Sequence, residues 1–338
     1  MRFEHVSVVD VHRVVAPIRV ASAEIEARLA ATMDRIGMRG GILQGTAGID
    51  ARRFWEPGVQ PSDAATRAAE GLLARVDVPR ERIGVVFSTS VCRDFLEPST
   101  ACLVHGNLGL SPACLNFDLG NACLAFINAM DLAGAMIERR AVDYALIVDG
   151  ENSRHVVEAT IARLAAPTCT AEMFRDQFAT LTLGSGGVAM LLAHSSLAPD
   201  GHPFVGAVSR AATEHNRLCH GQNDEMVTDT RTLLVEGLKL AAKTYALACE
   251  TLGWGPGVLD HHHIHQVSRV HTDQLARTLR ITVNEADLIF PEQGNIGPAS
   301  VPTVLAQAAA EGRLQRGERI GLLGIGSGLN CSMAEILW

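Results

Sequence analysis

The sequence predicts a layered α/β protein made of two similar halves. Strand-like and helix-like runs alternate along its 338 residues, which is the order expected when helices cover the faces of a sheet. A weak internal repeat relates a segment in the first half to one in the second. Hydrophobic residues make up 47% of the chain and charged residues 20%, so composition and length suit one large domain or two fused ones.

The predicted strands are short apolar runs bounded by polar or small residues, and the predicted helices are longer runs with helical periodicity. In chain order, we expect strands at 6–15, 83–88, 113–117, 144–148, 188–192, 204–208, 262–265, 320–325 and 331–337. We expect helices at 62–75, 124–140, 156–164, 171–178, 228–252, 269–279 and 299–311.

The internal repeat consists of a small-residue turn, a buried helix and a return to a strand. From Asn121 to Asp143 is 22 positions, and from Asn295 to Glu318 is 23. Any two βαβ units share part of this pattern, so duplication remains a hypothesis. We predict an N-terminal half at 1–197 and a C-terminal half at 198–338. A segment at about 151–180 lies outside the repeat, and it either caps a site or is ordinary surface packing.

Charge and cysteine usage exclude several classes of protein. The net charge of −8 does not fit a broad nucleic-acid interface, which needs an excess of basic residues. No run of about 18 apolar residues is present, so we predict no membrane span. The N-terminal apolar run is interrupted by charged residues, and we predict no signal peptide. Eight cysteines without a CxxC pair indicate reduced thiols and a cytoplasmic protein.

Cys123 is the candidate nucleophile. It follows a predicted strand and the turn Gly120-Asn121-Ala122, and a long apolar helix begins just after it. Small residues in the turn let a substrate approach, and the free N–H groups of a helix N-terminus favour a thiolate. Most cysteines are inert core residues, and it is this position that distinguishes Cys123.

His265 ends a histidine-rich run in which His261, His263 and His265 would share one face of a strand. That pattern invites a metal site, but no carboxylate or thiol ligands are recognisable nearby. We therefore predict no metal, and we interpret His265 as a neutral imidazole that donates a hydrogen bond or relays a proton.

Asn295 and Glu97 are the other candidate side chains. Asn295 lies in a glycine-rich turn before a helix, where its amide could stabilise an oxyanion, although asparagine is also common in turns for conformational reasons. Glu97 precedes Pro98 in a loop. Such a glutamate is usually solvated, but in an apolar pocket its pKa would rise and it could act as a base.

A glycine turn near the C-terminus includes Gly326 and Ser327. Its spacing does not match a dinucleotide-binding loop, and too few residues follow for a βαβ unit. We expect its backbone N–H groups to face a site, with the Leu183–Gly187 segment as the counterpart in the first half.

Taken in order, four motifs resemble the thiolase superfamily and, within it, the ketoacyl synthase III branch. They are Cys123 in Asn-Ala-Cys-Leu-Ala-Phe, His265 in Ile-His-Gln, Asn295 in Gly-Asn-Ile-Gly-Pro-Ala-Ser, and the Gly326-Ser327-Gly328 turn. The resemblance covers essentially the whole chain. The runs at 90–100 and 226–231 and the C-terminal strand look like those of enzymes that join two fatty acyl-CoAs head to head in bacterial olefin synthesis.

The resemblance implies a five-layer αβαβα thiolase fold with two pseudo-symmetric halves, normally as a homodimer. It implies that Cys123 takes an acyl group from CoA while the backbone N–H groups of Cys123 and the Gly326–Ser327 turn hold the oxyanion. His265 and Asn295 would bind the second acyl-CoA, and Glu97 would reach the partner subunit's site as the base. The product would be a 2-alkyl-3-oxoacyl-CoA. Acyl-CoA is substrate, and no cofactor is expected.

Three other readings remain open at this stage. The chain could be a decarboxylative 3-oxoacyl-ACP synthase III that uses a malonyl thioester, although Gln266-Val267-Ser268 departs from the Gln-Ala-Asn that such enzymes often have. It could be a silent partner that only binds acyl chains or another synthase. A simple thioesterase activity is expected only as a side reaction. Transient contact with downstream olefin-pathway enzymes is expected by analogy alone.

Overall fold

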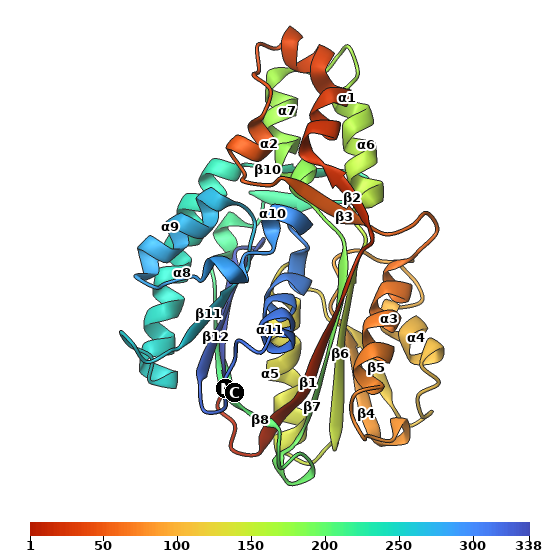
Figure 1. The fold of residues 1–338 in the computed structure, drawn as a ribbon, viewed down its shortest axis with the longest axis vertical. Helices are drawn as coiled ribbons and strands as arrows, with labels where there is room; N and C mark the ends of the chain where they lie inside the picture. The colour runs from red at the N-terminus through yellow and green to blue at the C-terminus, as the bar shows by residue number, and fades with distance from the viewer.

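The computed structural model describes residues 1–338 as five alternating layers of helix and sheet (Figure 1). One half-sheet contains β1 (Val6–Val15), β4 (Ile83–Ser88), β5 (Leu115–Asp118), β6 (Tyr144–Glu151) and β7 (Gly186–His194). The other contains β8 (His202–Ala211), β11 (His261–Ile264), β12 (Arg319–Gly326) and β13 (Asn330–Leu337). Hydrogen bonds between β1 and β8 connect the two, so the strand order is β11-β12-β13-β8-β1-β7-β6-β4-β5.

The helices fall into three layers around these half-sheets. Two helices, α5 (Ala125–Glu138) and α11 (Ser300–Ala310), form the middle layer and contact strands of both. The outer layer on the first half-sheet is α3 (Pro61–Leu73) with α4 (Thr100–Asn107), and that on the second is α8 (Thr230–Leu252) with α9 (Arg269–Leu279). This is the five-layer αβαβα thiolase fold that the resemblance implied.

The two halves repeat one topology. In the first, β4 is parallel to β6, β6 is antiparallel to β7, and β7 is antiparallel to β1. In the second, β11, β12, β13 and β8 follow the same sequence of parallel and antiparallel pairs. Only the counterpart of β5 is missing. This correspondence supports our proposed division at 197/198, which falls between β7 and β8.

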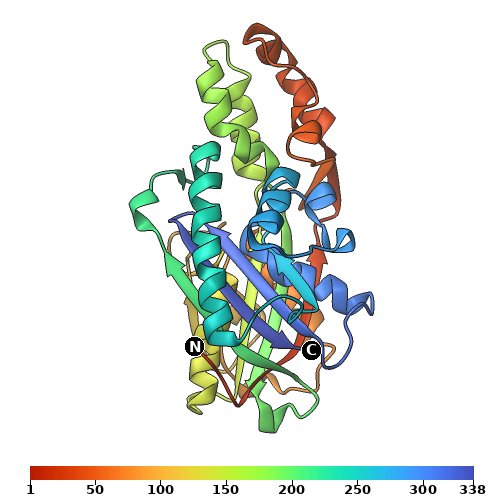
Figure 2. The ribbon, with the colours of Figure 1, turned by 90° about the vertical axis from the view of Figure 1, so that its left-hand side faces the viewer.

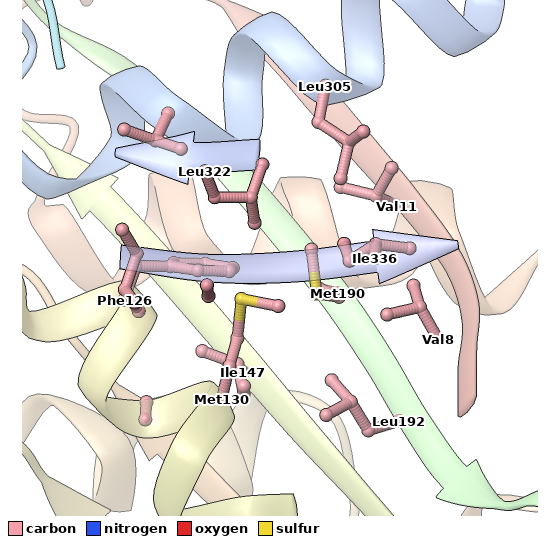
Figure 3. Close-up of a cluster of buried hydrophobic side chains, with 14 of the residues drawn as sticks. Val8, Val11, Phe126, Met130, Ile147, Met190, Leu192, Leu305, Leu322 and Ile336 are labelled. Atoms are coloured by element: carbon pink, nitrogen blue, oxygen red, sulfur yellow. The ribbon is translucent and has the colours of Figure 1, made fainter. Parts of the chain in front are cut away.

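The main core lies in the middle layer. Apolar side chains from α5 and α11 meet those of both half-sheets there, as Figure 3 shows for residues such as Phe126, Met130, Leu305 and Leu322. Complete burial of one such side chain contributes roughly 1.5–3 kcal/mol relative to exposure. The middle helices are therefore firmly held, and so are the turns that begin them.

A helical cap projects beyond the layers, at the top of Figures 1 and 2. It combines the hairpin β2 (Ile18–Ala21)/β3 (Ala51–Phe54) and α1 (Ser22–Arg35) and α2 (Ile42–Gly45) with α6 (Arg154–Leu164) and α7 (Ala171–Gln177). Buried side chains from both sources, including Leu29 and Phe174, form one cluster. The predicted insertion at 151–180 is thus only half of the cap, because residues 18–54 supply the rest.

Every predicted strand and helix overlaps an observed one. The helices α1 and α4 and the short elements β2, β3, α2, β9 (Cys219–Gly221), β10 (Met226–Thr228) and α10 (Phe290–Gln293) were not predicted. No helix of the structure combines the length and the apolar character needed to cross a membrane.

Candidate active site

Cys123 lies in the turn between β5 and α5, two residues before the helix begins at Ala125. The preceding residue, Ala122, has a positive φ of 45°. The backbone of Gly326, at the end of β12, packs against the cysteine so closely that a Cβ there would lie 3.1 Å from the Cys123 nitrogen. A side chain at this position would make an unusually tight contact with the cysteine. The turn of one half therefore rests on the glycine segment of the other.

A chain of hydrogen-bonded amide and hydroxyl side chains fixes this turn. The Asn121 amide donates to Asn128 at 2.7 Å and accepts from Asn330 at 3.1 Å. Asn128 in turn donates to Ser332 at 2.9 Å. These bonds join α5 to β13. The position of Cys123 is thus set by residues of both halves.

The thiol of Cys123 is held in its neutral form. Its pKa is raised to about 12, mainly by burial and to a smaller extent by Cys219 and the Glu151 carboxylate. We expected the helix N-terminus to favour a thiolate, and this expectation is wrong for the substrate-free site. Loss of hydration disfavours the charged form, and it outweighs the one backbone hydrogen bond that lowers the pKa.

His265 follows directly after β11 and is 1% exposed. Its backbone N–H donates to the carbonyl of Leu323 on β12 at 2.8 Å. The Nδ1 atom is buried without a partner. Burial lowers the pKa of His265 to about 3, with a smaller contribution from His271. The imidazole is therefore neutral at physiological pH, as expected.

Asn295 lies in the turn before α11, and its side-chain oxygen accepts from the Gly297 N–H at 3.0 Å. That bond leaves the Nδ2 amide as the group that can donate to a ligand. The backbone of Asn295 bonds to Thr182 and Gly184 of the first half at 2.9 Å each. The glycine segment that follows Leu183 therefore supports Asn295 in the way that Gly326 supports Cys123. It occupies the place predicted for the counterpart of the Gly326 turn in the first half.

Strand β12 and the side chain of Glu151 link the segments that carry these three residues. β12 bonds to His265 at Leu323, and three residues further along it packs against Cys123 at Gly326. The Glu151 carboxylate influences the Cys123 thiol and lies 3.6 Å from where a Cβ on Gly297 would be, two residues past Asn295. The turns that carry Cys123 and Asn295 and the segment that carries His265 are thus linked through β12 and Glu151.

Glu97 does not join them within one chain. It lies in the loop between β4 and α4 and is exposed, next to Phe95 and Leu96, which are 57% and 87% exposed. The predicted apolar environment for this carboxylate is absent from the isolated chain. A partner subunit would have to supply it.

Two buried carboxylates, Asp149 and Glu151, were not predicted as site residues. They alternate with Gly150 at the end of β6, so they share one face of the strand. Burial raises the pKa of both, that of Asp149 well above its usual value. The sequence signal was an Asp-Gly-Glu run closing a strand that is otherwise apolar.

His261, His263 and Asp287 form a cluster that was partly anticipated from the histidine run. Their ligand atoms lie within 4.8 Å of one another, and Asp287 is the carboxylate that the sequence did not reveal. Arg313 pairs with one oxygen of Asp287, so the protein already provides a cation for this acid. A cavity of about 500 Å³ borders His261 and Asp287, but none of Cys123, His265 and Asn295 lines it.

Two curated proteins resemble this chain over its full length. One, "Acyl-CoA:acyl-CoA alkyltransferase" of Xanthomonas campestris pv. campestris, is 52% identical over 338 residues, covering 100% of both chains. The other, with the same name, from Shewanella oneidensis, is 34% identical over 351 residues, again covering 100% of both. A family profile described as 3-oxoacyl-[acyl-carrier-protein (ACP)] synthase III C terminal matches residues 249–338.

Solved structures of Xanthomonas campestris OleA superpose on this chain with a TM-score of 0.97 at 52% identity. One has cerulenin bound and covers 100% of this chain and 98% of its own. Another has lauric acid and lauroyl-CoA bound and covers 99% and 100%. Others carry substitutions at a glutamate, a cysteine and a histidine. These three residues are separated by 26 and 142 positions, as are Glu97, Cys123 and His265 here.

Proposed function

This chain belongs to the family of the acyl-CoA:acyl-CoA alkyltransferases (OleA proteins), and we propose from that premise that it condenses two long-chain fatty acyl-CoAs head to head, without decarboxylation. The observation that carries the proposal is the 52% identity over the whole chain to such an enzyme. The product is a 2-alkyl-3-oxoacyl-CoA, the first intermediate of long-chain olefin synthesis. Acyl-CoA is both acyl donor and acceptor.

In the first half-reaction the Cys123 sulfur attacks the thioester carbonyl of an acyl-CoA. The backbone N–H groups of Cys123 and the Gly326–Ser327 turn stabilise the oxyanion. CoA leaves with the proton of the thiol, and the acyl group remains on Cys123. The tight contact of Gly326 with Cys123 supports this role.

In the second half-reaction another acyl-CoA binds with its thioester oxygen near the Asn295 amide and His265. A neutral imidazole with pKa about 3 can donate a hydrogen bond but adds no positive charge. Glu97 of the partner subunit removes the α-proton, and the enolate attacks the acyl-Cys123 carbonyl. Once the new carbon–carbon bond has formed, the carbon–sulfur bond of the acyl-enzyme breaks and Cys123 is released. Because no CO2 is lost, the reaction needs this base.

A homodimer would give Glu97 its site. Five exposed apolar side chains lie on the Glu97 loop and the edge strand β5: Val91, Phe95, Leu96, Leu115 and Phe117. An edge strand with such side chains is a surface that proteins usually cover. Contact with a second copy there would bury the patch and take Glu97 out of water.

The decarboxylative alternative rests on the synthase III profile that matches residues 249–338. One experiment separates the two reactions. Purified protein is incubated with myristoyl-CoA alone or with an added malonyl thioester, and the products are identified by mass spectrometry. We expect the 2-alkyl-3-oxoacid, or the ketone it decays to, from myristoyl-CoA alone. A product that forms only when malonyl thioester is present would favour the alternative.

A further inference from the structure

Glu151 binds the loop that carries Glu97, lies next to Gly297 in the Asn295 turn, and raises the pKa of the Cys123 thiol. We infer that Glu151 is a positioning residue for condensation, which holds the start of this loop against the wall of the Cys123 site. The inference rests on the proposed function, because it concerns how Glu97 is delivered to its substrate.

On the side of the loop, the Glu151 carboxylate binds two donors. One oxygen accepts from the Val91 N–H at 2.6 Å and the other from the Cys92 N–H at 3.3 Å. The Glu151 carbonyl accepts from the Trp55 indole at 3.0 Å. From this anchor the chain runs outward to Glu97, five residues after Cys92, and most of the side chains between are exposed.

The loop has one further tie before Glu97. Asp94 accepts from the backbone and the hydroxyl of Ser62 on α3, at 2.9 and 2.5 Å. This tie lies outside the Cys123 site. Glu151 and Asp94 therefore offer two ways to loosen the same loop, and only the first also contacts the site.

On the side of the site, Glu151 is 4% exposed and raises the pKa of the Cys123 thiol. It also lies 3.6 Å from the position of a Cβ on Gly297, in the Asn295 turn. One carboxylate thus connects the nucleophile, the amide turn and the base-carrying loop.

The neighbouring Asp149 explains how Glu151 keeps its charge. Asp149 accepts only from Thr89, at 2.6 Å, and its other oxygen is buried without a partner. Two like charges on one buried strand face cannot both persist. Asp149, with fewer donors and a pKa raised well above its usual value, keeps the proton. Glu151, with two backbone N–H donors, remains the anion that these donors favour.

In the proposed homodimer, the loop of one subunit delivers Glu97 to the site of the other. Glu151 in one subunit would then control condensation at the cysteine of its partner. Mixed dimers test this directly. In the parental dimer, one subunit carries Cys123→Ala and the other carries Glu97→Gln, so the only working site combines the second subunit's Cys123 with the first subunit's Glu97.

Glu151→Gln is then introduced into one subunit at a time, and the ratio of condensed product to free fatty acid is measured with myristoyl-CoA. We expect a fall of roughly 10- to 100-fold when the change is in the Glu97-bearing subunit, because small misplacements of a catalytic group have effects of this size. Asp94→Asn in that subunit should also lower the ratio. Acylation of the working Cys123 should stay within about threefold.

Two further variants guard against a general loss of structure. Glu151→Asp keeps the charge but is too short to reach both backbone N–H groups, so it should also lower the ratio from the Glu97-bearing subunit. Glu138→Gln is the matched control, because this carboxylate also accepts two backbone N–H bonds, from Glu4 and His5, at the far end of α5. It should leave the ratio unchanged.

The outcomes separate this inference from the proposed function. If the parental mixed dimer makes no product, delivery of Glu97 to the partner is wrong and the inference is overturned with it. If the parental dimer is active and Glu151→Gln lowers the ratio only in the subunit with the working Cys123, Glu151 does not act through the Glu97 loop. The inference alone is then overturned. No effect in either subunit overturns it as well.

Discussion

The turns that begin α5 and α11 occupy equivalent places in the two halves, yet they present different chemistry. The first presents a thiol, with two buried carboxylates nearby. The second presents the amide of Asn295, and the same half contributes the neutral His265. Each turn rests on a glycine segment of the opposite half. The same scaffold therefore presents a thiol on one side and neutral hydrogen-bond donors on the other, which suits the two half-reactions that we propose.

The sharpest test of this division is Cys123→Ala. It removes the only covalent step, so we expect both acylation and condensation to fall by roughly a thousandfold or more. Intact-protein mass spectrometry with myristoyl-CoA would show no acyl adduct. An adduct on another residue would mean that the nucleophile has been misassigned.

Glu97→Gln should separate the two half-reactions. We expect acyl-Cys123 to form at the normal rate while condensation falls by roughly 100- to 10,000-fold, the range for loss of a general base. The adduct is followed by mass spectrometry and the product by chromatography. Condensation that continues at the normal rate would show that the base is another group.

Asn295→Ala tests the donor side of the comparison. Loss of one oxyanion donor typically costs about 3–4 kcal/mol, or roughly 100- to 1,000-fold in rate. We expect this loss in condensation, with acylation of Cys123 nearly unchanged. If acylation fell equally, Asn295 would serve both half-reactions and the division between the turns would fail. His265→Ala should show the same preference for the second half-reaction.

The smallest effect concerns the protonation state of the Cys123 thiol before substrate binds. With a pKa of about 12, Cys123 should be alkylated by iodoacetamide about tenfold faster for each pH unit from 7 to 10, because the thiolate fraction rises in that proportion. Peptide mapping against Cys123→Ala identifies the site. A rate that levels off below pH 9 would mean that the N-terminus of α5 outweighs burial.

The sequence predicted the layers well, because the buried strands and middle helices are long apolar runs with clear periodicity. It predicted the cap poorly, since α1 and β2 belong with α6 and α7 only through long-range packing. Candidate residues could be proposed from the sequence where a motif carried them, as for Cys123 and Asn295. Glu151 was missed because its role depends on burial and on a loop some 60 residues away. The neutral thiol was missed for the same reason, since desolvation is a property of the folded site.

The unequal edges of the sheet also bear on how many copies can assemble. The first half ends in β5, whose Leu115 and Phe117 are 47% and 49% exposed, and the second half has no counterpart to this strand. If two copies pair through β5 about a twofold axis, each uses the same patch, and no equivalent patch remains on the outside. The assembly then closes at two subunits instead of growing into a filament. The absence of this strand from the second half would thus limit the size of the oligomer.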